Sequence, residues 1–136
     1  LFRSGFLSAL REAEISTEPL IAYGEHFSRS EGARICAEWI AKGVMPEALV
    51  TTSYVLLEGV LDTLREYPEV MQNIRLATFG DNQLLDFLPA KVNALPQQFS
   101  LIADRALELA LAATEHNYTP GVEVIPRRLK VRSHTG

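Results

Sequence analysis

The sequence predicts an α/β domain in which a mostly parallel sheet is covered by helices on both faces. Short apolar runs of strand length alternate along the chain with segments whose apolar residues recur at helical spacing. The 136 residues suit one domain, and a composition of 47% hydrophobic and 22% charged residues is typical of a globular protein. No apolar run in the sequence reaches the roughly 20 residues that a membrane-spanning helix needs.

The first half of the chain is expected to contain three helices and two strands. A helix over residues 2–13 precedes a strand at 20–23. Ser28 and Glu31 form the pattern of a capping box, which predicts that Ser28 caps the next helix and that the Glu31 carboxylate bonds back to the helix start. Gly43 should end that helix. A strand at residues 49–51 and a helix at 54–66, capped by Ser53 and ended by Pro68, complete this half.

The second half repeats the scheme. Strands are expected at residues 74–79 and 92–95, with a turn at 80–82 and a short helix at 83–88 between them. Pro96 leads into a long helix that ends near residue 115, and a turn-rich loop follows at 117–121. Residues 122–125 and 129–131 are candidates for short terminal strands.

Polar and aromatic side chains follow the predicted strands where each strand ends. In open α/β sheets, ligands bind beyond the carboxyl ends of the strands. An acid, hydroxyls, amides and an aromatic ring suit a sugar, which offers alternating hydroxyls and a flat C–H surface. The same residues also have structural interpretations as helix caps, turn residues or packing groups. The residues concerned are Phe27, Thr52, Ser53, Asp81 and Gln97.

The sequence gives little support for a catalytic site, a phosphate-binding loop or a metal site. There is neither a Gly-x-Ser-x-Gly turn nor a glycine-rich phosphate loop, and the three histidines lack the spacing of metal ligands. We therefore expect no catalysis, no cofactor and no metal. The single cysteine, Cys36, is expected to pack in the core of a protein from a reducing compartment. A net charge of −4 argues against DNA binding by this segment itself.

Several segments resemble the lac-repressor family of sugar-responsive transcription regulators. The similarity covers residues 45–60, the Thr-Phe-Gly-Asp-Asn stretch at 78–82 and the Leu-Leu-Asp-Phe-Leu stretch at 84–88, and it extends across nearly the whole chain. The stretches at 78–82 and 84–88 are specific to the fructose-responsive branch of the family. The resemblance implies a cytoplasmic regulator that is not an enzyme and whose effector is a phosphorylated fructose.

The resemblance also implies a domain plan. The family's fold is a periplasmic-binding-protein-like pair of α/β lobes that hold the effector between them. Residues 1–95 would form most of the C-terminal lobe. Residues 96–136 would contain a crossover at Pro96, a helix of the N-terminal lobe and a return toward the C-terminal lobe. The chain lacks an initial methionine and is expected to be a fragment without the headpiece that binds the DNA operator.

Effector contacts follow from the same resemblance. Phe27 matches an aromatic position that stacks on the ligand, and Ser53, beside Thr52, matches a polar contact. Asp81 matches the acid that accepts hydrogen bonds from the effector, and Gln97 matches the crossover glutamine. The family's arginine position falls on Phe2, so Arg3 reaches the effector only if the register shifts by one residue.

Assembly into a homodimer, or a tetramer, is a further implication. Its interface is expected on the helices at residues 54–65 and 83–88. The short helix is apolar around its circumference, so part of its surface should seek a partner, unless that helix is enclosed between the sheet and its neighbour. The interface residues are expected to include Val55, Glu58, Leu85, Phe87 and Leu88. The main alternative for the function is a periplasmic sugar-binding transport protein of the same fold.

Overall fold

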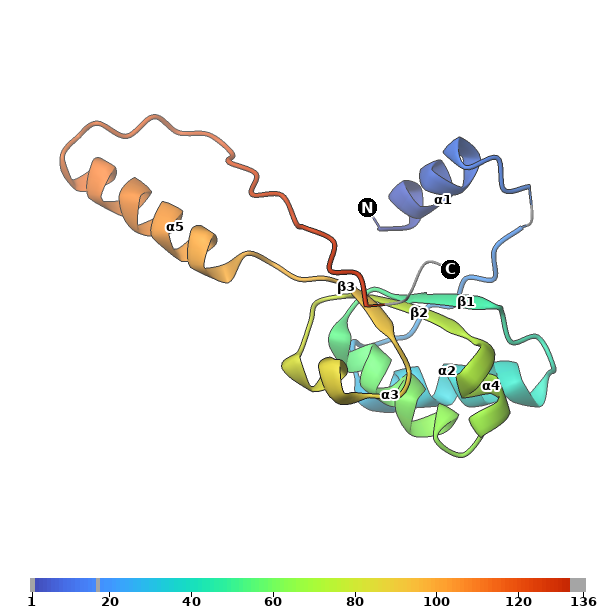
Figure 1. Ribbon diagram of the computed structural model, residues 1–136. Helices are drawn as coiled ribbons and strands as arrows, with labels where there is room; N and C mark the ends of the chain where they lie inside the picture. The colour runs from blue at the N-terminus through green and yellow to red at the C-terminus, as the bar shows by residue number, and fades with distance from the viewer. Residues whose placement is uncertain (1, 17, 133–136) are drawn as a thin grey trace.

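The computed structural model describes residues 2–16 and 18–132. Figure 1 shows a small sheet with several helices packed against it and one long helix that reaches away from it. The order of elements confirms the predicted α/β class. In chain order they are α1 (Phe2–Glu12), α2 (Arg29–Ala41), β1 (Ala48–Thr51), α3 (Tyr54–Leu64), α4 (Pro68–Asn73), β2 (Arg75–Phe79), the 3-10 helix η1 (Gln83–Phe87), β3 (Val92–Leu95) and α5 (Phe99–Thr114).

The sheet has the strand order β1-β2-β3, and both pairs of neighbouring strands are parallel. Leu49 pairs with Leu76, and Leu76 pairs with Val92, so one row of apolar side chains crosses a single face of the sheet. Two residues further along, the Thr51 hydroxyl donates a hydrogen bond of 2.7 Å to the Thr78 hydroxyl. Three predicted strands are therefore confirmed, with nearly the predicted ends.

The prediction of a strand at residues 20–23 is wrong, because the structure shows coil there. In a doubly wound sheet of order 2-1-3-4-5, the second strand pairs with the first and not with the third. The described residues before Leu20 form α1 and coil, so the segment has no neighbouring strand to supply hydrogen bonds. Its side chains stay largely exposed, with Leu20 at 46% and Tyr23 at 70%.

The terminal strands suggested at residues 122–125 and 129–131 do not form either. Of these residues, Lys130 alone joins the sheet, through a single antiparallel bridge to Ala94 with backbone hydrogen bonds of 2.7 and 2.9 Å. A ladder requires two backbones that run side by side over several residues. The returning segment instead forms this single bridge with β3 (Figure 1), and further hydrogen bonds between the two involve the side chains of Arg127, Arg132 and Asn93.

The N-terminal cap of α2 and the role of Pro68 differ from the prediction. Ser28 caps α2 by accepting a hydrogen bond from the Glu31 N–H at 3.2 Å, but the Glu31 carboxylate accepts from the backbone N–H of Glu25 instead of Ser28. Only half of the capping box therefore forms. Pro68 does not end α3, which stops at Leu64, but begins α4. Proline is tolerated there because the first N–H groups of a helix lack helical partners.

The core lies between the sheet and the helices α2 and α3. It contains Cys36, Leu57, Val60, Leu64, Leu76, Leu85 and Val92. The two helices cross in backbone contact at two glycines. A Cβ on Gly59 would lie 1.9 Å from the Arg29 carbonyl oxygen, and a Cβ on Gly32 would lie 2.1 Å from that of Leu56. Any larger residue at either position would force the helices apart.

The remaining helices lie outside this core. In Figure 1, α1 lies on the opposite side of the sheet from α2, α3 and α4. The ring of Phe2 meets that of Phe79 edge-on, with 4.6 Å between ring centroids. Helix α5 extends away from the sheet, and none of its residues is buried.

Candidate functional site

The parallel strands bring several of the predicted polar residues to one edge of the sheet. Thr52 and Ser53 follow β1, Asp81 follows β2 after one glycine, and Gln97 follows β3 after Pro96. Because the three strands are parallel, their carboxyl ends share an edge. The sequence-based prediction of a common polar edge is thus consistent with the topology of the sheet.

Ser53 has a structural role at this edge. It is the N-cap of α3, and its hydroxyl accepts a hydrogen bond from the Leu56 N–H at 3.4 Å. That distance is long for a hydrogen bond, so the hydroxyl is only weakly engaged. Both Ser53 and its neighbour Thr52 are half-buried and remain within reach of solvent.

Gly80 places the start of the Asp81 turn against α3 and β3. Its φ of +89° lies in the region that favours glycine, and an added Cβ would come within 3.3 Å of the Cβ of Tyr54. The Gly80 N–H donates to the Leu95 carbonyl at 3.0 Å. Burial, followed by the charge of Glu58, raises the pKa of Tyr54, and the Asp81 carboxylate adds to this shift.

Asp81 belongs to a cluster of four charges. Its Oδ1 lies 2.7 Å from the Nη2 of Arg132, a contact not aligned as a hydrogen bond, and its Oδ2 lies 3.3 Å from the Nζ of Lys130. Asp86 also pairs with both cations, at 2.7 Å from the Nε of Arg132 and 3.3 Å from the Nζ of Lys130. Hydrogen bonds from Arg132 and then from Lys130 lower the pKa of Asp86.

Arg132 is the most enclosed member of the cluster. Its side chain is 6% exposed, against 15% for Asp81 and 41% for Asp86. Its backbone N–H donates to the side-chain oxygen of Asn93, and its Nη1 donates to the Val92 carbonyl. Arg132 therefore fixes the returning C-terminal segment to β3.

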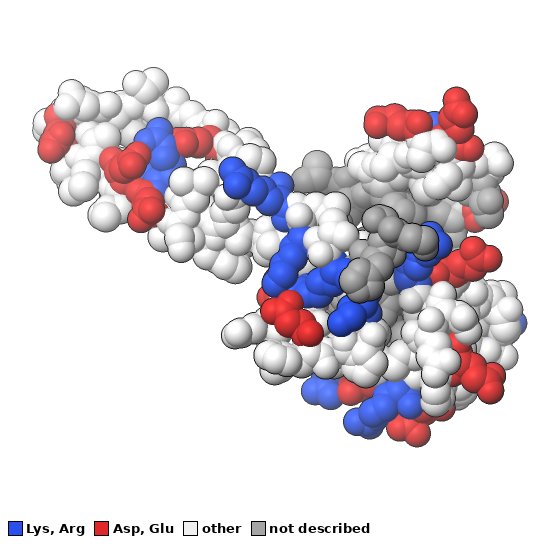
Figure 2. All heavy atoms as spheres, viewed as in Figure 1, with Lys and Arg blue, Asp and Glu red and all other residues white. Residues whose placement is uncertain are grey.

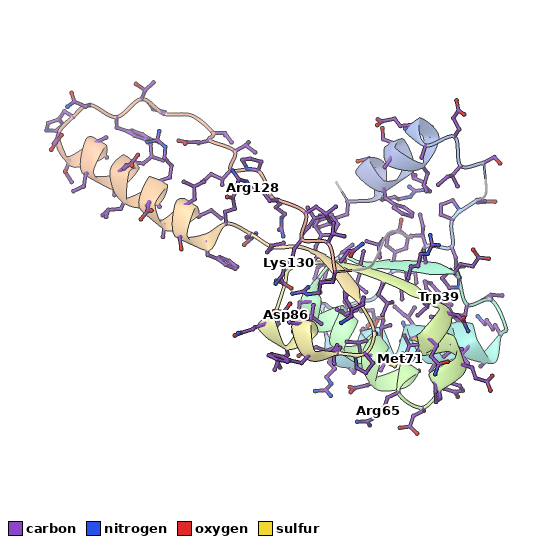
Figure 3. All side chains as sticks on the ribbon, in the orientation of Figure 1. Trp39, Arg65, Met71, Asp86, Arg128 and Lys130 are labelled. Carbon is purple, nitrogen blue, oxygen red and sulfur yellow. The ribbon has the colours of Figure 1, made fainter. Side chains whose placement is uncertain are left out.

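The C-terminal basic residues are a feature that the sequence-based site prediction missed. Four of the six residues from 127 to 132 are basic, and this density was the available signal: Arg127, Arg128, Lys130 and Arg132. Figure 2 shows basic side chains gathered where the returning segment meets the sheet. Figure 3 shows Lys130 close to Asp86, with Arg128 earlier in the segment and farther from the sheet.

The other predicted effector residues lie on the surface. Phe27 is 70% exposed in the loop before α2, Gln97 is exposed before α5, and Arg3 is exposed on α1. No hydrogen bond or ion pair within the described ranges joins any of them to Asp81. The described chain therefore presents these residues without closing them around a ligand.

The predicted interface residues fall into two groups. Phe87 is 77% exposed, whereas Leu85 is 1% exposed and packs in the core. Val55 and Glu58 are half-buried on α3, and Leu88 is partly buried against the core. The apolar surface of η1 that is free for a partner comes from Phe87 and from Leu84, which is 64% exposed. The side chain of Leu85 is unavailable to a partner.

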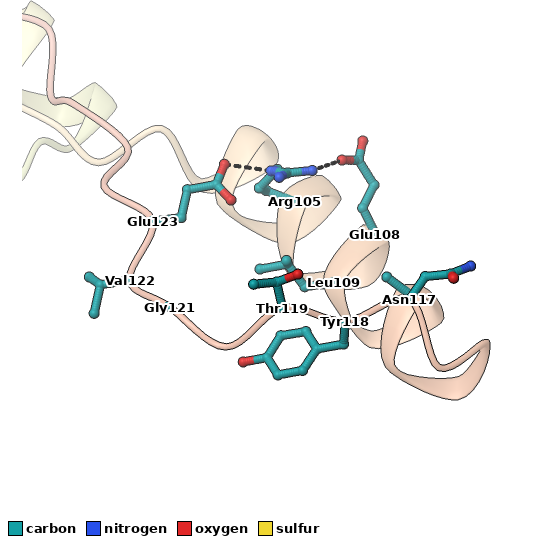
Figure 4. Close-up of a pocket in the computed structure, with 10 residues that line it drawn as sticks. Arg105, Glu108, Leu109, Asn117, Tyr118, Thr119, Gly121, Val122 and Glu123 are labelled. Carbon is teal, nitrogen blue, oxygen red and sulfur yellow. Dashed lines mark hydrogen bonds and ion pairs between the residues drawn. The ribbon is translucent and has the colours of Figure 1, made fainter.

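Two hollows of the described chain lie away from this edge. One of about 380 Å³ lies between α5 and the loop that follows it, with Arg105, Leu109 and Tyr118 among its lining residues (Figure 4). A second, of about 330 Å³, lies near Glu47 and Arg75 at the amino end of the strands. Within the described residues there is no group of three potential metal ligands, and no helix is long and apolar enough to cross a membrane.

Comparison with known proteins identifies one matching family model and several similar regulatory proteins. The family model of the periplasmic binding protein-like domain matches residues 1–135. The chain is 57% identical over 129 residues to a fructose operon regulatory protein of Vibrio cholerae, covering 95% of this chain and 39% of that protein. It is 40% identical over 110 residues to a catabolite repressor/activator of Escherichia coli, covering 79% of this chain and 33% of that protein.

A solved structure is also closely similar. It is the Cra transcriptional dual regulator from Pseudomonas putida in complex with fructose 1-phosphate, with a TM-score of 0.82 and 51% sequence identity. The match covers 96% of this chain and 48% of that one. The chain thus spans less than half the length of each of these three proteins.

Proposed function

Because the chain belongs to the periplasmic binding protein-like domain family, we propose that it is the effector-sensing part of a cytoplasmic, sugar-responsive transcription regulator, with a fructose phosphate as its effector. The similarity to the Pseudomonas putida regulator, whose structure contains fructose 1-phosphate, carries this proposal. The polar edge formed by Ser53 and Asp81 supports it, because carboxylates and hydroxyls hydrogen-bond sugar hydroxyls well.

Effector binding at this edge would be thermodynamically coupled to DNA binding. Residues 1–95 would form most of one lobe, and α5 would contribute to the other, with the effector held between the two. The operator would be bound by a headpiece outside this chain. Effector binding and DNA binding would then change each other's affinity by the same factor.

Dimerisation is the second part of the proposal. Phe87 and Leu84 give η1 an exposed apolar surface, and Val55 and Glu58 of α3 are half-buried and would join it in the interface. A two-fold contact would let equivalent patches meet and close the assembly. Leu88 lies at the margin of this surface, and Leu85 would support it from the core.

Calorimetric titration of the full-length protein with fructose 1-phosphate tests the proposal. Asp81→Ala should weaken binding at least about tenfold, because charge-assisted hydrogen bonds are lost. Asp81→Asn, which keeps the shape of the side chain, separates the loss of charge from any effect on folding. Glu47→Ala is the matched control, because Glu47 is an exposed acid at the opposite edge. An unchanged affinity in both Asp81 variants would refute the assignment.

A further inference from the structure

The loop at residues 24–28 carries Phe27 with little support from its own backbone. Phe27 is 70% exposed, and the segment that leads to it is coil. In the described part of the chain, residues 24–27 take part in one backbone–backbone hydrogen bond, from the Ser28 N–H to the His26 carbonyl at 3.1 Å. Loops with few such bonds open locally at a low cost in free energy. The position of the ring therefore depends on side chains that hold the loop.

Glu31, in the first turn of α2, holds this loop on both sides of Phe27. Its Oε2 accepts a hydrogen bond from the Glu25 N–H at 3.2 Å, and its own N–H donates to the Ser28 hydroxyl at 3.2 Å. The first bond fixes the chain two residues before the ring, and the second fixes it one residue after the ring. A single residue of a regular helix thus spans the aromatic position.

Arg34 orients the Glu31 carboxylate. Its Nε donates to Oε1 at 2.9 Å and its Nη2 donates to Oε2 at 3.2 Å, so both carboxylate oxygens are engaged. Such a two-point contact fixes the plane of a carboxylate as well as its position. The Glu31 side chain is 18% exposed. Hydrogen bonding from Arg34, and less strongly from the Glu25 N–H, lowers the pKa of Glu31 despite its partial burial.

Gly24 leaves the space that the Glu31 carboxylate occupies. A Cβ added at Gly24 would lie 2.7 Å from the Glu31 Oε2 and 3.3 Å from the His26 carbonyl oxygen. The nearer atom is the end of a side chain, so an alanine at this position would displace the carboxylate. Gly24 therefore allows the carboxylate to reach the Glu25 N–H.

We propose that Glu31 is a positioning residue of the effector site, which holds the Phe27 ring where it stacks on the sugar. This inference rests on the proposed function and on the expected stacking of Phe27 on the effector. Stacking requires the ring at one distance and one orientation. A ring that is held there before binding avoids the entropic cost of ordering the loop when the effector arrives. Glu31 thus acts on affinity through Phe27.

Calorimetric titration of the full-length protein with fructose 1-phosphate compares Glu31→Ala with Glu38→Ala. Glu38 is the matched control, because it lies on the same helix and also pairs with Arg34, but forms no hydrogen bond to the loop within the described ranges. Glu31→Ala should weaken binding about three- to tenfold, and Glu38→Ala should leave it within about twofold. Glu31→Gln keeps an acceptor for the Glu25 N–H and should lie between Glu31→Ala and the unchanged protein.

Two further variants show whether Glu31 acts through the ring. In a Phe27→Ala background, Glu31→Ala should weaken binding by less than about twofold, because no ring remains to be positioned. Gly24→Ala, which displaces the carboxylate and keeps Glu31 itself, should weaken binding to a similar extent as Glu31→Ala. Hydrogen exchange at the Glu25 amide should become faster in Glu31→Ala and stay unchanged in Glu38→Ala.

The outcomes separate this inference from the proposed function. If the unchanged protein binds fructose 1-phosphate and Glu31→Ala keeps that affinity, the assignment of Glu31 is wrong and the proposed function stands. An equal loss from Glu31→Ala with and without the Phe27 ring would also overturn the assignment, because Glu31 would then act by another route. If the unchanged protein binds no fructose phosphate, the proposed function fails, and the role of Glu31 in effector binding fails with it.

Discussion

Replacing Gly59 by alanine should destabilise the protein, although alanine is the better helix former. In an open helical position, glycine to alanine gains about 1 kcal/mol from helix propensity. At Gly59 the new Cβ would lie 1.9 Å from the Arg29 carbonyl oxygen and 2.6 Å from the backbone nitrogen of Ala33. Both neighbours are backbone atoms of α2, so no side-chain rotation can relieve the contact.

The size of the effect follows from the displacement that α2 must undergo. The helices would have to separate by roughly 1.5 Å at this point to restore ordinary contact, and close-packed interiors resist such shifts. Overpacking of this kind typically costs about 1–3 kcal/mol, and contact between two backbones lies at the upper end of that range. We therefore expect a net loss of about 2 kcal/mol in the free energy of unfolding.

Urea unfolding monitored by the fluorescence of Trp39 measures this loss. Trp39 is the single tryptophan of the 136 residues and lies on α2 at 9% exposure. Gly5→Ala is the matched control, because Gly5 lies within α1 and no atom would contact its added Cβ within 4 Å. Gly5→Ala should be neutral or stabilising. A Gly59→Ala variant as stable as the Gly5→Ala variant would refute the close crossing of α2 and α3.

Because Arg132 and then Lys130 lower the pKa of Asp86, this carboxylate should add stability above about pH 4, the ordinary Asp range, and lose it as the pH falls through the lowered value. Below that range, the free energy of unfolding should fall less steeply with decreasing pH in Asp86→Asn than in the unchanged protein. Identical slopes would contradict the pairing. Burial raises the pKa of Cys36 to about 11, so iodoacetamide should label this thiol only after unfolding, and rapid labelling of the native protein would count against its burial. Phe87→Asp should weaken the proposed dimer of the full-length protein in sedimentation, and an unchanged dimer would place the interface elsewhere.

Local patterns in the sequence predicted the three strands that form and most helix boundaries. The run at residues 20–23 shows where such patterns stop being sufficient. It is apolar and has strand length, but a strand also needs a neighbour, and neither composition nor periodicity says whether one is present. The same limit explains residues 122–125, whose β-branched content favours a strand that no other segment of the described residues completes.

The site was predictable only in part, for a related reason. Asp81 and Ser53 follow strands, and the parallel topology places strand ends together, so their common edge follows from the order of elements. The partners of Asp81 come from about 50 residues further along the chain, at Lys130 and Arg132. No local pattern connects them. The half-buried position of Arg127 likewise depends on the return of the chain to β3.

The most direct test of the central claim is a crystal structure of the full-length protein with fructose 1-phosphate. We expect the sugar at the carboxyl edge of β1, β2 and β3, with its hydroxyls hydrogen-bonded to the Asp81 carboxylate. A ligand bound away from this edge, for example in the hollow between α5 and the loop that follows it, would contradict the account.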